Sequence, residues 1–175
     1  MVTPMLNILQ RHPEWWNADR TRTGFDGSPH AQSDDILLRS CVTIGRSLME
    51  MHGDLEASDR EVLHLMPDVK RTALDLMRLV GGSRLGRVVA TRLASGDKIT
   101  PHADEGPYAE YYNRFHVVLQ GLPGSVFECG DEAVQMLTGE IWWFNHRLQH
   151  SVSNNSKDDR VHLIVDIHVD DYGTD

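Results

Sequence analysis

The chain has 175 residues, of which 40% are hydrophobic and 25% are charged, and its formal net charge is −9 at pH 7. This composition is typical of a soluble globular protein that buries roughly two-thirds of its unfolded surface. No apolar run approaches the ~18 residues of a membrane span, and the acidic balance makes a nucleic-acid partner unexpected. Because the first residues lack signal-peptide features and the two cysteines form no CxxC motif, we expect a cytoplasmic protein without a disulfide framework.

The N-terminal half carries helix signals that are separated by loops. The motif SDRE at residues 58–61 has the pattern of a capping box and predicts the start of a helix. Pro67 is expected to open a second helix, which the glycine pair at 81–82 ends. Between the loops, the apolar run at residues 34–44 predicts a strand.

From residue 86 onward, short segments rich in β-branched and aromatic residues alternate with turns. They lie at residues 86–94, 113–120, 125–129, 132–137, 140–145, 150–153 and 160–169. Strands of this length and spacing predict a sandwich or small barrel. We therefore expect a mainly β fold with flanking helices packed on one sheet. Residues 1–175 should form a single domain, in which residues 1–85 cover a β core formed by residues 86–170.

Side-chain alternation separates the two faces of the predicted strands. In the last strand, apolar residues occupy one face, while the other carries Arg160 and His162. Another strand places Arg114 and His116 together on one face. A buried arginine needs a partner such as a carboxylate, so these faces could line an interior that holds a charged ligand. The pattern alone equally allows arginines on a solvated sheet face.

The motif PHAD places His102 and Asp104 two positions apart, so both side chains point to the same side of an extended chain. His150 is the best candidate for a third metal ligand from a distant strand. Two imidazoles and one carboxylate suit Fe(II) in oxygenases, whereas zinc more often takes a closed tetrahedral set. The His-x-Asp spacing alone is a weak indication, because it recurs at His52 and His168.

About half of the chain, residues 86–170, resembles the aspartyl/asparaginyl β-hydroxylase family of Fe(II)/2-oxoglutarate dioxygenases. The motifs that carry the resemblance are PHAD, RFH, GEIWWF, HSVSN and the arginine that precedes HLIVD. The resemblance implies a double-stranded β-helix, or jelly roll, and the cofactors Fe(II) and 2-oxoglutarate. It makes His102 and His150 iron ligands. Asp104 completes a triad, although the animal enzyme that gives the family its name looks to lack this carboxylate.

The resemblance also implies which residues bind the cosubstrate. Arg160, helped by the hydroxyl of Thr91, would bind the distal carboxylate of 2-oxoglutarate. Arg114 and His116 would contact its other end, near the iron. The implied reaction is hydroxylation of an unactivated C–H bond in an amino acid or an Asp/Asn-type peptide residue, with release of succinate and CO2. The alternative is a cupin-type protein that binds a metal or small molecule without 2-oxoglutarate.

A small-molecule or peptide substrate is the expected partner, with neither nucleic acid nor membrane, and the sequence does not indicate an oligomeric state. The segment 12–39 is expected to cover the mouth of the barrel. Among the other histidines, we expect His146 to be solvated, His162 to be a hydrogen-bonded core residue, and His168 to lie on the surface.

Overall fold

The computed structural model describes residues 2–41 and 54–170, so His52 and the end of the predicted strand at 34–44 lie outside the described residues. The strands are β1 (Ser33–Ser40), β2 (Ser58–Asp59), β3 (Arg84–Leu93), β4 (Lys98–His102), β5 (Asn113–Gln120), β6 (Ser125–Cys129), β7 (Glu132–Val134), β8 (Ile141–Trp143), β9 (His150–Asn154) and β10 (Arg160–His168). The helices are α1 (Thr3–Arg11), the short 3-10 helix Pro13–Trp15, α3 (Glu61–His64), α4 (Pro67–Leu79) and α5 (Pro107–Tyr111).

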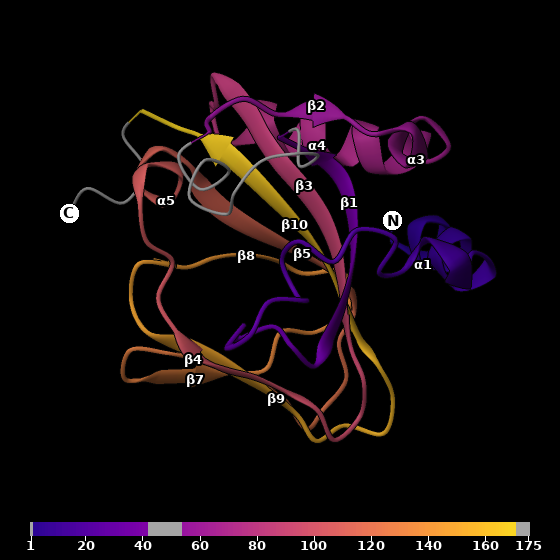
Figure 1. Ribbon diagram of the computed structural model, residues 1–175, viewed down its shortest axis with the longest axis vertical. Helices are drawn as coiled ribbons and strands as arrows, with labels where there is room; N and C mark the ends of the chain where they lie inside the picture. The colour runs from indigo at the N-terminus through magenta and orange to yellow at the C-terminus, as the bar shows by residue number, and fades with distance from the viewer. Residues whose placement is uncertain (1, 42–53, 171–175) are drawn as a thin grey trace.

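Within the described residues, the strands form two antiparallel sheets. The larger sheet has the order β2-β1-β3-β10-β5-β8, and the smaller has the order β4-β9-β6-β7. Figure 1 shows β1, β3, β10 and β5 crossing the upper part of the molecule, with β4, β7 and β9 below them. The predicted mainly β fold is confirmed.

Helices α1, α3 and α4 cover the outer face of the larger sheet, as the sequence predicts. Buried apolar residues of α1, α3 and α4 pack against the apolar face of the central strands in one cluster. In β10 this face consists of Val161, Leu163, Val165 and Ile167, each no more than 4% exposed. Figure 1 places α3 and α4 above β3, on the side away from the smaller sheet. Because the helices take up the apolar stripe, the polar face of β10 is turned toward the interior.

The space between the sheets has an apolar part and a polar part. Side chains from both sheets, including Val118 of β5, Phe127 of β6 and Val152 of β9, form a second buried cluster. The inward face of β10 carries instead Arg160 and His162, which are 3% and 0% exposed. The alternative of arginines on a solvated sheet face is therefore wrong for Arg160.

Some local predictions agree with the structure and others differ from it. The helix at Pro67 begins where predicted and ends just before Gly81, whose φ of +67° suits glycine. The capping-box prediction at residues 58–61 is wrong, because Ser58 and Asp59 pair with β1 as strand β2 and the helix α3 begins only at Glu61. Strand β4 and helix α5 have no counterpart in the predicted elements. None of the helices in the described residues has the length and hydrophobicity of a transmembrane span.

Candidate metal centre and buried polar interior

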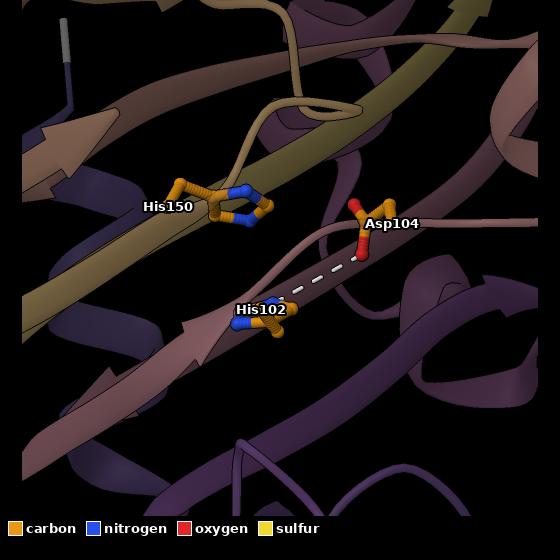
Figure 2. A group of neighbouring side chains, drawn as sticks. All are labelled: His102, Asp104 and His150. Carbon is orange, nitrogen blue, oxygen red and sulfur yellow. Dashed lines mark ion pairs between the residues drawn. The ribbon is translucent and has the colours of Figure 1, made fainter. Parts of the chain in front are cut away.

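Three predicted ligands from separate positions converge between the sheets. His102 ends β4 and His150 begins β9, and the two residues are directly paired across these neighbouring strands. Asp104 follows two residues after His102. One ligand atom from each residue lies within 4.8 Å of the others, and His102 Nε2 is 4.0 Å from Asp104 Oδ1. Figure 2 shows the three side chains pointing toward one another, with this last pair joined by a dashed line.

Both imidazoles are held with Nε2 available. Nδ1 of His102 donates to the carbonyl of Thr100 at 2.8 Å, and Nδ1 of His150 donates to the carbonyl of Leu148 at 2.9 Å. A neutral imidazole that donates through Nδ1 carries its lone pair on Nε2. The buried Nε2 of His102 has no hydrogen-bond partner within residues 2–41 and 54–170. Burial lowers the pKa of His150 to about 4, so this ring is neutral near pH 7. The donor set therefore fits a divalent cation.

The carboxylate of Asp104 is fixed by the chain around it. Its backbone N–H donates to the carbonyl of His146 at 2.9 Å, and its Oδ2 accepts from Arg114. Burial favours the neutral acid, but Arg114 and the neighbouring histidines outweigh burial and hold the pKa of Asp104 below its usual value. The group is therefore ionised, as a metal ligand must be.

Deeper between the sheets, four buried polar residues each have an atom without a hydrogen-bond partner in the described part of the chain. These atoms are Thr91 Oγ1, His116 Nε2, Arg160 Nη2 and His162 Nε2. His162 is paired with Thr91 on the neighbouring strand β3, and its Nδ1 lies 3.2 Å from His116 Nδ1. Unsatisfied buried polar atoms are uncommon, so a cluster of them indicates a polar ligand.

Arg160 is the most informative member of this cluster. None of the ion pairs among the described residues involves it, and burial lowers its pKa to about 9. A guanidinium that is 3% exposed and has no anion beside it among the described residues is energetically unfavourable. A bound carboxylate would offset this cost.

A cavity of about 450 Å³ opens above the candidate metal centre. Its lining includes Thr21, Arg22, Phe25, Pro29 and His30 from the N-terminal segment, together with His102, Asp104, Tyr108, Ile164 and Asp166. The expected position of segment 12–39 over the mouth agrees with this lining. The segment also joins β4, because the carbonyl of Pro29 accepts from the backbone of Thr100 at 3.1 Å.

Two predictions about other histidines are wrong. His146 is not solvated but 5% exposed, because its Nε2 bonds to the carbonyl of Ala109 at 3.1 Å and holds the turn against α5. His168 lies at the surface with its side chain 23% exposed, and its ring stacks on Tyr111 at 3.9 Å while its Nδ1 donates to the carbonyl of that residue. The expectation of a fully hydrogen-bonded His162 also fails, since its Nε2 has no partner in the part of the chain that the structure describes.

Some residues around the site were not given a role from the sequence. Asp166 binds Arg114 with both oxygens, Tyr108 donates to Asp166 at 3.1 Å, and the ring of His30 lies edge-on to His102 at 4.7 Å. Asp166 follows Arg160 by six positions in an extended strand, so a period of two puts it on the same face, and the sequence contained this indication of its position. His30 gave no signal, because it lies in a loop without periodicity.

The buried histidines predict a pH dependence of stability in the metal-free protein. Burial lowers the pKa of both His116 and His162 well below 6.5, so below that pH the unfolded chain binds more protons than the folded chain. The free energy of unfolding is therefore not reduced by these histidines above pH 6.5. As pH falls below 6.5, it decreases by up to about 1.4 kcal/mol per pH unit for each histidine. Denaturant unfolding of the metal-free protein between pH 8 and pH 5 measures this slope. His162→Leu should flatten it, and an unchanged slope would contradict the explanation.

The fold and the site together define a two-sheet β protein in which two histidines and a carboxylate converge in a set that could hold one cation. The family model of aspartyl/asparaginyl β-hydroxylase matches residues 53–169, and the chain belongs to this family. An L-proline cis-4-hydroxylase from Rhizobium meliloti (strain 1021) is 35% identical over 83 residues, which are 47% of this chain and 29% of that protein. The chain therefore matches less than a third of this curated relative.

Two solved structures are similar to about half of this chain. A predicted oxalate decarboxylase from Thermotoga maritima matches 54% of this chain and 73% of its own, with 20% identity and a TM-score of 0.40. A cupin domain from Bordetella pertussis Tohama I matches 50% of this chain and 85% of its own, with 18% identity and a TM-score of 0.39. Nothing about function follows from these likenesses. Family membership agrees with the jelly-roll fold expected from the sequence.

Proposed function

We propose that this chain is an Fe(II)- and 2-oxoglutarate-dependent hydroxylase that acts on an unactivated C–H bond of an amino acid, free or as an Asp/Asn-type residue of a peptide. The reaction consumes the substrate, 2-oxoglutarate and O2 and yields the hydroxylated product, succinate and CO2. One observation carries the proposal: the convergent ligand set lies between the same two sheets as Arg160, a buried cation without an anion among the described residues.

His102, Asp104 and His150 would hold the iron. Bound Fe(II) would supply the redox chemistry that couples O2 and 2-oxoglutarate to oxidation of the C–H bond. The chain's contribution is to fix both imidazoles through their Nδ1 donors and to keep the carboxylate ionised. Three protein ligands leave positions for the cosubstrate.

Arg160 and Thr91 would bind the distal carboxylate of 2-oxoglutarate. Both are buried, and each has an atom without a partner in the described ranges. His116, which the family resemblance places at the iron end of the cosubstrate, and His162, to which the sequence gave no binding role, add two further unpartnered nitrogens to this interior. Since the two Nδ1 atoms face each other at 3.2 Å, one ring donates and the other accepts. One Nε2 then carries a proton and the other a lone pair.

The substrate would enter from the cavity above the metal ligands. Its volume of about 450 Å³ falls within the range of roughly 300–1,000 Å³ that is usual for small-molecule sites. The name of the matched relative makes free L-proline the first substrate to try. Arg22, which lines the cavity, is held by Asp35 at 2.6 Å, so this wall of the cavity is both polar and fixed.

Anaerobic addition of Fe(II) and 2-oxoglutarate to the metal-free protein tests the cofactors. We expect a weak visible charge-transfer band that requires both additions. Aerobic incubation with L-proline, other amino acids and Asp- or Asn-containing peptides should then give succinate release coupled to one of them. Absence of both the band and coupled succinate would favour the cupin-type alternative. A chelator control should abolish both signals.

A further inference from the structure

Arg114 is engaged by carboxylates of the chain itself. Its Nε and Nη2 donate to the two oxygens of Asp166 at 2.9 and 3.1 Å, and its Nη1 donates to Oδ2 of Asp104. The side chains of Arg114 and Asp166 are only 16% and 2% exposed. Burial disfavours the charged guanidinium, but the two carboxylates outweigh burial and raise the pKa of Arg114 above its usual value.

Asp166 is in turn fixed from two directions. The register of β5 and β10 pairs it directly with Arg114. The hydroxyl of Tyr108, on α5, donates to Asp166 Oδ2 at 3.1 Å and accepts from the backbone N–H of Arg87 at 2.7 Å. Two central strands and a helix therefore determine where Arg114 points.

This arrangement decides which oxygen of Asp104 faces the metal position. Asp104 lies beyond the end of β4, where no strand pairing orients its side chain. Arg114 occupies Oδ2, and Oδ1 is left 4.0 Å from His102 Nε2. A carboxylate ligand usually depends on such an outer partner for its orientation.

We propose that Arg114 is a positioning residue for the metal-ligating carboxylate of Asp104, anchored by Asp166, rather than a contact of 2-oxoglutarate. This inference rests on the proposed function, because it requires Asp104 to bind the ion. It revises the role that the family resemblance implies for Arg114. In a chain that carries Asp104, the guanidinium has a partner within the protein.

The charges around Arg114 predict how substitutions should change the affinity for the cation. Asp166 offsets the charge of Arg114, so the negative charge of Asp104 remains available to the cation. Asp166→Asn removes both the anchor and this compensation, and it leaves a less opposed positive charge beside the ion. Arg114→Lys keeps the charge but cannot reach two carboxylates with a planar fork.

Co(II) titration of the protein without 2-oxoglutarate is the test, followed by affinity and by the visible spectrum of the bound ion. We expect Asp166→Asn and Arg114→Lys to weaken Co(II) binding by roughly 10- to 100-fold, as for other outer partners of ligands, and to alter the spectrum. The KM for 2-oxoglutarate at saturating metal should stay unchanged. Tyr108→Phe should give a smaller loss of affinity, and it serves if Asp166→Asn does not fold.

Arg92→Lys is the matched control. The Arg92 guanidinium also bonds a carboxylate through two nitrogens, that of Asp34, but it is not among the residues that line the cavity. Its Co(II) affinity should equal that of the wild type. Unchanged Co(II) affinity in Arg114→Lys with a raised KM for 2-oxoglutarate would overturn the inference while leaving the proposed function in place. A wild-type chain that binds no Co(II) would overturn the proposed function itself.

Discussion

Replacement of Arg160 by glutamine is expected to raise the KM for 2-oxoglutarate by roughly 10- to 150-fold, because hydrogen bonds to charged groups contribute about 1.5–3 kcal/mol. Arg160→Lys should fall between this variant and the wild type, since an ammonium supplies the charge without the planar fork. Steady-state succinate formation at varied 2-oxoglutarate measures both effects. If the contact is made equally in the ground and transition states, kcat at saturation should change little.

The stability of the Arg160→Gln variant gives a second test, which asks whether the guanidinium of Arg160 lacks a stabilising anion in the unliganded protein. Removing a buried cation that has no anion in the described chain should not destabilise the unliganded protein, whereas loss of a paired arginine would. The melting temperature of unliganded Arg160→Gln should therefore be no lower than that of the wild type. Arg147→Gln, an exposed change of equal charge in the turn before His150, is the control for KM. A KM for Arg160→Gln equal to that of the control would contradict the assigned role.

Strand faces were predictable because alternation is a local property of the chain. In β10 the apolar stripe and the polar face follow from a period of two alone. The structure places Arg160 and His162 in the interior, which is one of the two positions that the pattern left open. A period of two also puts Asp166 on the face of Arg160 and puts Arg114 on the face of His116, but it does not indicate that Asp166 and Arg114 meet.

Pairing between distant strands was not predictable, and it decides the site. His102 and His150 face each other because β4 pairs with β9 in a register interrupted by an irregularity after Ile99. The segment before His102 contains Pro101 and polar residues, so it lacked the apolar alternation that identifies a strand. An edge strand can form from such a sequence when its neighbour supplies the hydrogen bonds, which is a tertiary effect.

The partner of Arg114 could not be predicted from the sequence of its own strand. An inward arginine requires an anion, but the strand that contains it cannot reveal whether that anion is a ligand or another residue. The answer lies in the register of β5 and β10, which sets Asp166 opposite Arg114. At residues 58–61 pairing between strands also made the prediction from the local sequence wrong. Pairing of Asp59 with Arg39 on β1 overrode a local helix signal.

Substitution of His150 by alanine is expected to abolish substrate-coupled succinate formation and to lower Co(II) affinity by more than about 100-fold, since loss of an outer partner already costs roughly 10- to 100-fold. The ring is 7% exposed and neutral, so its removal deletes a ligand without leaving an unpaired charge. Calorimetric Co(II) titration and the succinate assay measure the two effects separately.

His168→Ala provides the matched control for this variant, because His168 also belongs to a His-x-Asp motif and lies 3.0 Å from Asp170. That motif stands at the far end of β10, where the ring stacks on Tyr111 and lines no part of the cavity above the metal ligands. Co(II) affinity should survive in His168→Ala and fail in His150→Ala. Equal Co(II) affinities in the two variants would mean that His150 is not a metal ligand. The His-x-Asp spacing alone would then have suggested a metal centre that the convergence of residues between the sheets does not form.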